Sequence, residues 1–167
     1  MNDAHKRVAV GALIFNDCNE ILIVKPHYKD GWQVVGGMVE SSENPSSAMR
    51  REIKEEVGLD LEVGRLLCVD YGPKDSDSIH LTFDCGRVGD SAQISYPDNE
   101  IVEHRFVSEK ETSSLLRPKG AFRMRRVLEA FRTGSVAYID DDAGSNQGKS
   151  SLTKGYPFSL KNGILRP

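Results

Sequence analysis

The sequence predicts an α/β fold, on three observations. Strand-like runs of β-branched and apolar residues recur along the chain, the first over residues 8–15. Residues 44–59 carry both a start and a stop signal for a helix. A length of 167 residues, with 38% hydrophobic and 28% charged residues, is typical of one globular domain that buries its own core.

The N-terminal runs predict a β-hairpin. Residues 8–15 and 21–24 are apolar and are joined by a link rich in Asn and Asp. Lys25-Pro26 should end the second strand, because proline cannot donate to a sheet ladder. Residues 32–35 predict a further short strand, which stops at Gly36-Gly37.

The helix over residues 44–59 is well bounded. Asn44 is a good N-cap, and Pro45 suits the first helical position, where its missing N–H has no cost. Gly58 can take the left-handed conformation after the last turn, and Leu59 supplies the apolar residue that usually follows.

Later elements follow from the same patterns. Strands are predicted at residues 61–71, 78–85 and 101–107, with a polar gap at 72–77, and a second helix at 119–132 that ends at Gly134. After Tyr138 the chain turns polar, so we expect a folded domain over residues 1–139 and a flexible C-terminal tail over 140–167.

Charge and cysteine content restrict the function. The chain has 25 acidic and 22 basic residues and a net charge of -3, which argues against nucleic acid as the main partner. Its first apolar run is too short for a membrane span. Cys18, Cys68 and Cys85 lack zinc-site spacing and are typical of reduced thiols in a cytoplasmic protein.

One face of the 44–59 helix is expected to be strongly acidic. Glu52, Glu55 and Glu56 stand at spacings that place them together on a helix, where they repel one another. They also lie in the second half of the helix, where the macrodipole disfavours negative charge. A divalent cation with oxygen ligands, Mg²⁺ or Mn²⁺, would remove this conflict and would bridge the carboxylates to a substrate phosphate. An acid-rich, solvated helix face stays open as the alternative.

The residues before the helix extend the pattern. Gly36-Gly37 allows a sharp turn and a close backbone approach, and Glu43 can pair with Arg51. From Gly37 the order is G-x5-E-x7-R-E-U-x-E-E-x-G-U, with U bulky and aliphatic, up to Leu59. At every defined position this resembles the Nudix box, and residues 7–133 as a whole resemble Nudix hydrolases.

The resemblance implies a fold and a reaction. The fold is an α/β/α sandwich around a mixed sheet, with the box as a loop–helix–loop. The reaction is hydrolysis of a nucleoside diphosphate linked to another moiety, by attack of water at phosphorus with Mg²⁺ or Mn²⁺. The substrate is then a small-molecule nucleotide derivative, and a homodimer is left open.

Carried across by position, the resemblance assigns roles in the box. Glu55 and Glu56 become the principal metal ligands, and Glu52 a further ligand or the group that orients or deprotonates the water. The carbonyl of Gly37 is an additional ligand. Glu43 and Arg51 form the salt bridge that holds the loop.

Residues outside the box are less constrained. Glu100 or Glu103 supplies another metal ligand or the base, with Glu103 preferred, or is an exposed strand carboxylate. Trp32 is a packing residue or a stacking platform for a base, and Tyr28 and Gly36 are candidate substrate contacts. A basic cluster near the second helix either attracts phosphates or is a solvated face: Arg117, Lys119, Arg123, Arg125 and Arg126.

Two departures from the family pattern and two rival functions complete the prediction. Val35 stands where family members usually have proline. Pro73 lies closer to the box than the corresponding proline of ADP-ribose pyrophosphatases, so an assignment to that group has only weak support. The rivals are a non-catalytic Nudix-fold module that binds a nucleotide to regulate a partner, and a structural protein with an incidental acidic helix.

Overall fold

The computed structural model describes residues 5–71, 78–89 and 92–140. The predicted polar gap at 72–77, and all but the first residue of the predicted tail, lie outside the described residues. No described helix is long and apolar enough to cross a membrane.

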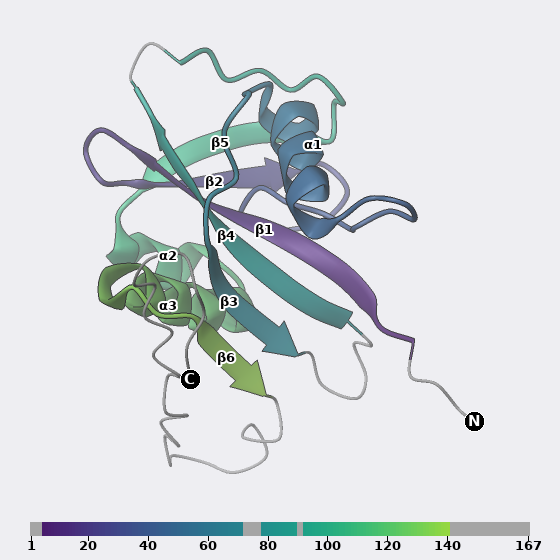
Figure 1. Cartoon of the computed structure of the whole chain (residues 1–167). Coiled ribbons are helices and arrows are strands. Elements are labelled where there is room, and N and C mark those ends of the chain that lie inside the picture. Colours follow the sequence, from purple (N-terminus) through teal and green to yellow (C-terminus); the bar gives the residue numbers. More distant parts are fainter. Residues whose placement is uncertain (1–4, 72–77, 90–91, 141–167) are drawn as a thin grey trace.

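The core of the fold is one mixed sheet of six strands in the order β5-β2-β1-β4-β3-β6 (Figure 1). The β1–β4 and β3–β6 pairs are parallel, and the β1–β2, β2–β5 and β3–β4 pairs are antiparallel. The strands are β1 Arg7–Asn16, β2 Ile21–Pro26, β3 Leu66–Tyr71, β4 Ser78–Val88, β5 Ile101–Val107 and β6 Ala137–Asp140.

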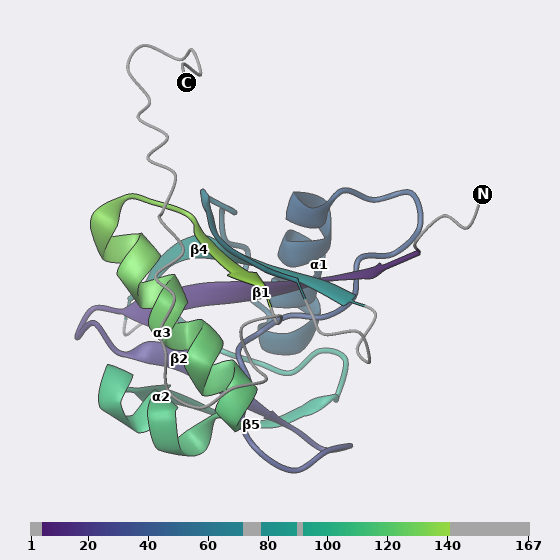
Figure 2. The ribbon, with the colours of Figure 1, turned by 90° about the horizontal axis from the view of Figure 1, so that it is seen from below.

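Helices cover both faces of this sheet (Figure 2). Helix α1 (Pro45–Val57) packs on one face, where Met49, Ile53 and Val57 are fully buried. Helices α2 (Glu109–Leu115) and α3 (Pro118–Thr133) cover the other face. The two apolar layers confirm the α/β/α sandwich with a mixed sheet.

Helix α1 begins and ends where its sequence signals predict. The Asn44 side chain accepts a hydrogen bond of 2.9 Å from the backbone N–H of Ser47, and Pro45 follows as the first helical residue. Gly58 ends the helix in the left-handed conformation, with φ 70°.

The remaining predicted elements are confirmed in part. The hairpin, the strand at 101–107 and the α3 helix are present, and Gly134 ends α3 with φ 69°. The strand predicted at 61–71 begins only at Leu66. Residues 32–35 form isolated bridges rather than a strand.

Sequence reasoning missed two short elements. Helix α2 starts with a capping box, in which Ser108 and Glu111 satisfy each other's backbone N–H groups. That Ser-x-x-Glu signal is present in the sequence. Strand β6 has only four residues and depends on its parallel pairing with β3, which local sequence does not specify.

The segment before α1 runs between β1 and β2. These strands pair at Phe15 and Ile21, near their turn. Farther along, Gln33 pairs with Val24 of β2. On the other side, β1 and the segment form backbone hydrogen bonds of 2.8–2.9 Å: Val10 N–H to Gly37, Ala12 N–H to Val35, and Val39 N–H to Val8. The glycine turn is therefore fixed to the central strand of the sheet.

Gly36 makes the closest approach in this segment. Its φ is 151°, and a Cβ atom there would lie 2.1 Å from the carbonyl oxygen of Val10 and 2.9 Å from Cα of Gly11. Since these are backbone atoms of a buried strand, only glycine fits without a shift of the sheet or of the turn.

We expect Gly36→Ala to lower the free energy of unfolding by about 3 kcal/mol or more, because backbone strain and a backbone clash combine. Gly86→Ala is the matched control, since Gly86 has a φ of 77° but no heavy atom within 4 Å of a new Cβ. It should lose only about 1 kcal/mol. Urea unfolding of both variants measures the difference, and equal losses would contradict the packing argument.

Candidate functional site

The three carboxylates of α1 share one helix face but not one environment. Glu56 is 2% exposed and points inward, whereas the side chain of Glu52 is 13% exposed and that of Glu55 is 48% exposed. The acidic face thus runs from the core to the solvent, and only its outer end is a solvated helix surface.

Glu56 is held at the inner end by the glycine turn. One of its carboxylate oxygens accepts a 2.8 Å hydrogen bond from the backbone N–H of Gly36. Burial, together with the nearby charges of Glu52, Asp98 and Glu100, raises the pKa of Glu56 to about 8, against the lowering effect of the Gly36 hydrogen bond.

Glu52 lies directly against the second glycine of the turn. A Cβ atom on Gly37 would lie 2.3 Å from Oε1 of Glu52, so the absence of a side chain at Gly37 makes room for this carboxylate. Burial also raises the pKa of Glu52, and the charges of Glu55 and Glu100 add to the effect, while Arg51 lowers it.

Arg51 joins the loop to the helix. Its Nη2 lies 2.7 Å from Oε1 of Glu43 and donates at 3.0 Å to the carbonyl of Met38. Its Nη1 lies 2.9 Å from carboxylate oxygens of both Glu52 and Glu55. The hydrogen bond from Arg51 lowers the pKa of Glu43. The guanidinium therefore supplies the positive charge beside these acids.

Of the two downstream acids proposed from the sequence, Glu100 is the one whose charge acts on the box. The charge of Glu100 acts on Glu52, Glu56 and Tyr28. The side chain of Glu103, which the sequence favoured, instead pairs with Arg105 at 2.7 Å on the edge strand β5, so its role as a ligand or base stays a prediction.

Sequence reasoning missed Asp98. Its charge raises the pKa of Glu56, and its backbone N–H donates to the carbonyl of Glu55 at 3.3 Å. It belongs to a turn, and the side chain of Asp98 accepts from the N–H of Glu100 at 2.9 Å. The Asp-Asn-Glu sequence at 98–100 signals a turn, but not that the turn meets the end of α1.

The predicted substrate contacts fall into two groups. Tyr28 is 55% exposed. Partial burial raises its pKa, and the charges of Glu100, Glu56 and Glu52 add to this effect. Tyr28 therefore lies beside the box. Trp32 is half-buried in the α3-side core, and the guanidinium of Arg105 lies 4.6 Å from its ring centroid. One ring face is thus already covered, which favours the packing alternative for Trp32.

The basic residues near α3 do not form one phosphate-binding surface. Arg117 donates to the carbonyl of Asp30, Arg123 pairs with Asp70, and Arg126 pairs with Glu129. Arg125 lies over the ring of Phe122, 5.5 Å from its centroid. Most of these guanidinium groups therefore already contact other groups of the same chain.

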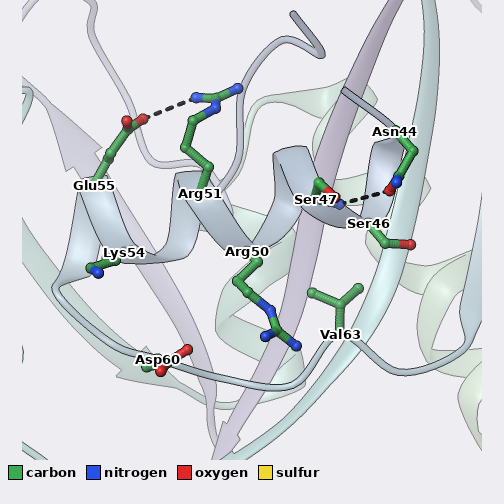
Figure 3. A pocket seen from close by; sticks show the side chains of 9 residues that line it. All are labelled: Asn44, Ser46, Ser47, Arg50, Arg51, Lys54, Glu55, Asp60 and Val63. Atoms are coloured by element: carbon green, nitrogen blue, oxygen red, sulfur yellow. Dashed lines mark hydrogen bonds and ion pairs between the residues drawn. The ribbon is translucent and has the colours of Figure 1, made fainter. Parts of the chain in front are cut away.

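A hollow of 770 Å³ lies on the outer side of α1 (Figure 3). Among the box carboxylates, only Glu55 lines it, so it is not the place where the acids converge. The lining residues are Asn44, Ser46, Ser47, Arg50, Arg51, Lys54, Glu55, Asp60 and Val63.

The box offers ligand chemistry that suits a hard cation. Its acidic donors are all carboxylate oxygens, which fit Mg²⁺ or Mn²⁺. The described residues contain no set of three His, Cys, Asp or Glu side chains already arranged around one point. Arg51 bridges two of the acids, so a cation would replace its contacts to Glu52 and Glu55.

Comparisons with known proteins agree with this geometry. An RNA pyrophosphohydrolase of Pseudomonas fluorescens (strain SBW25) is 35% identical over 66 residues, which are 40% of this chain and 42% of that protein. One of Halorhodospira halophila is 42% identical over 53 residues, 32% of this chain and 29% of that protein. The chain spans less than half the length of the curated relatives it matches.

Solved structures share the fold at low sequence identity. A UDP-X diphosphatase has a TM-score of 0.68 and 22% identity, over 84% of this chain and 70% of that chain. An ADP-ribose pyrophosphatase of Streptococcus suis has a TM-score of 0.66 and 24% identity, over 80% of this chain and 98% of that chain. The sequence profile of the NUDIX domain matches residues 5–131. The chain therefore belongs to the Nudix family.

Proposed function

We propose that this chain hydrolyses a phosphoanhydride bond in a nucleoside diphosphate linked to another moiety, with Mg²⁺ or Mn²⁺. The observation that carries the proposal is the convergence of Glu52 and Glu56 on Gly36-Gly37, with Glu55 beside them. A buried acid with a raised pKa, next to two more acids, is typical of a functional site rather than of a stabilising surface.

The residues divide the work as follows. Glu52, Glu55 and Glu56 would hold the cation, together with the carbonyl of Gly37, which also accepts from Val10 N–H at 2.8 Å. A bound divalent cation neutralises phosphate charge and acidifies water. Glu52 or Glu100 takes the proton from the attacking water, because both are more exposed than Glu56 and the charges of both act on it.

Other residues position rather than react. Arg51 keeps its bonds to Glu43 and Met38 and so holds the loop on α1 when its contacts to Glu52 and Glu55 are released. Tyr28 is exposed beside the box, where a substrate group can contact it.

The proposal also covers the substrate class, the cellular location and the domain organisation of the chain. The substrate is a small nucleotide derivative, in line with neighbours named for UDP-X and ADP-ribose. Free thiols at Cys18, Cys68 and Cys85 support a cytoplasmic location. A Nudix domain followed by a separate tail is retained, although β6 extends to Asp140, one residue beyond the proposed boundary of 139.

A substrate panel tests the reaction. We expect release of phosphate, pyrophosphate or a nucleoside monophosphate from at least one nucleoside triphosphate, dinucleotide, NDP-sugar or ADP-ribose with Mg²⁺ or Mn²⁺, and none with EDTA. A rise in melting temperature on adding the cation is the independent readout. No turnover together with no such rise would refute the proposal, whereas nucleotide binding without turnover would indicate the non-catalytic module.

Glu56→Gln tests the ligand assignment. We expect turnover to fall by at least about 100-fold, because the amide cannot supply the buried negative charge that a cation requires. Glu62→Gln is the matched control, since Glu62 is an exposed acid just beyond the helix and should keep full activity. Retained turnover in Glu56→Gln with a folded protein would show that the assignment is wrong.

The raised pKa of Glu56 predicts a specific pH dependence of stability. In EDTA, the protonated acid is favoured in the folded chain, so its stabilising contribution is present below pH 4.5 and is lost as the pH rises towards 8. The free energy of unfolding of the wild type, relative to that of Glu56→Gln, should therefore fall by a few kcal/mol across this range.

Urea unfolding at several pH values measures that difference. Saturating Mg²⁺ should restore the wild type at pH 8 and leave Glu56→Gln unchanged. A difference that stays constant between pH 4.5 and 8 would mean that Glu56 is ionised in the metal-free chain.

A further inference from the structure

A second buried carboxylate lies on the opposite face of the sheet. Asp70, near the end of β3, is 1% exposed and faces the layer beneath α3. The neighbouring inward residue of the strand, Cys68, belongs to the apolar core of that layer. A buried charge in such a layer is costly unless its oxygens are all satisfied.

Only one oxygen of Asp70 is satisfied. Nε and Nη2 of Arg123 both lie 2.6 Å from Oδ2. Oδ1 is buried and has no hydrogen-bond partner. An arginine and a carboxylate normally share two parallel bonds, one to each oxygen. Here both donors meet the same oxygen, which leaves the other free at a penalty of about 1–3 kcal/mol.

The neighbour across the strand pair is His80. The β3–β4 register places Asp70 opposite His80, and the β1–β4 register places Ala9 on the other side of His80. The ring is half-buried, and no hydrogen bond from it is found within the described residues. Burial, together with the charge of Arg123, lowers the pKa of His80 to about 4 against the raising effect of Asp70, so the ring is neutral near pH 7 and does not pair with Asp70 as an ion.

Lys29 links this cluster electrostatically to the Nudix box. The charge of Lys29 acts on His80, and the charges of Glu56 and Glu100 act on Lys29. The start of β1, the end of β2, the end of β3 and the start of β4 all lie at the same end of the sheet. A substrate whose phosphates lie at Glu56 can therefore direct its far end past Lys29 to His80.

We propose that Oδ1 of Asp70 accepts a hydrogen bond from an N–H group of the substrate's nucleobase, after the ring of His80 moves aside. Arg123 is a positioning residue that orients the carboxylate. A nucleobase fits because it is a flat ring of low charge with N–H donors on its edge, and a carboxylate is a good acceptor for such donors. The inference rests on the proposed function, since it assigns the substrate's base to this site.

Neutral nucleosides separate this site from the metal site. In EDTA, binding of guanosine is compared with N1-methylguanosine, and adenosine with N6,N6-dimethyladenosine, by calorimetry up to millimolar concentration. In at least one pair, we expect the parent to bind roughly 10- to 100-fold more tightly than its methylated form, because methylation removes the N–H. The ring signals of His80 should move in NMR spectra when that parent binds.

Asp70→Asn provides the matched change. Its amide oxygen can accept from Arg123, which leaves an NH₂ donor where Oδ1 was, so discrimination within the pair should be lost. Asp84→Asn is the control: it removes a half-buried acid from β4, where Oδ1 accepts from Gly86 N–H at 3.0 Å, and should keep the discrimination.

The outcomes distinguish a failure of the base site from a failure of the proposed function. Equal binding within both wild-type pairs, or no saturable binding of any nucleoside, overturns the inference without requiring the variant to fold. If the phosphate substrates are still hydrolysed with Mg²⁺, the proposed function stands and only the base site is wrong. Absence of turnover and of any cation effect is instead a failure of the proposed function.

Discussion

The hydrogen bond from Gly36 N–H to Glu56 is the contact on which the candidate site depends. It joins helix α1 to the glycine turn, and the turn is fixed to the central strand β1. Two backbone hydrogen bonds on either side of Gly36 fix it there: Ala12 N–H to Val35 and Val10 N–H to Gly37. Those bonds leave no room for a side chain at Gly36. The position of α1 on the sheet, the burial of Glu56 and the close packing of Glu52 against Gly37 all follow from this arrangement.

The charges around α1 follow from the same constraint. Burial of Glu56 in the core raises its pKa, and the neighbouring acids raise it as well, because their negative charges also disfavour the ionised form. Arg51 pairs with Glu52 and Glu55 but, among the described residues, not with Glu56 at the inner end of the face, so its positive charge stabilises the outer end. The buried acid at the inner end therefore has no direct cationic partner among the described residues, and a bound cation would add the most there.

Much of this could be predicted from sequence, and the exceptions have physical reasons. The bounds of α1 were predictable because Asn44, Pro45 and Gly58 act locally. The β6 strand and the role of Asp98 were not, because each depends on contact with a segment distant in sequence. Glu103 was preferred for its place just before the strand at 104–107, and the structure places it within the edge strand β5, where Arg105 pairs with it.

Two buried acids on opposite faces of the sheet share one feature. Glu56 and Asp70 are each bonded by one fixed donor group, Gly36 N–H and the Arg123 guanidinium. Burial raises the pKa of Glu56, and Oδ1 of Asp70 has no hydrogen-bond partner, so each buried acid is costly to the fold. A chain selected for stability alone would replace both with apolar residues. Lys29 lies within electrostatic reach of Glu56 and of His80 beside Asp70. The simplest account of both acids is that one substrate completes them together, with its phosphates and cation at Glu56 and its base at Asp70.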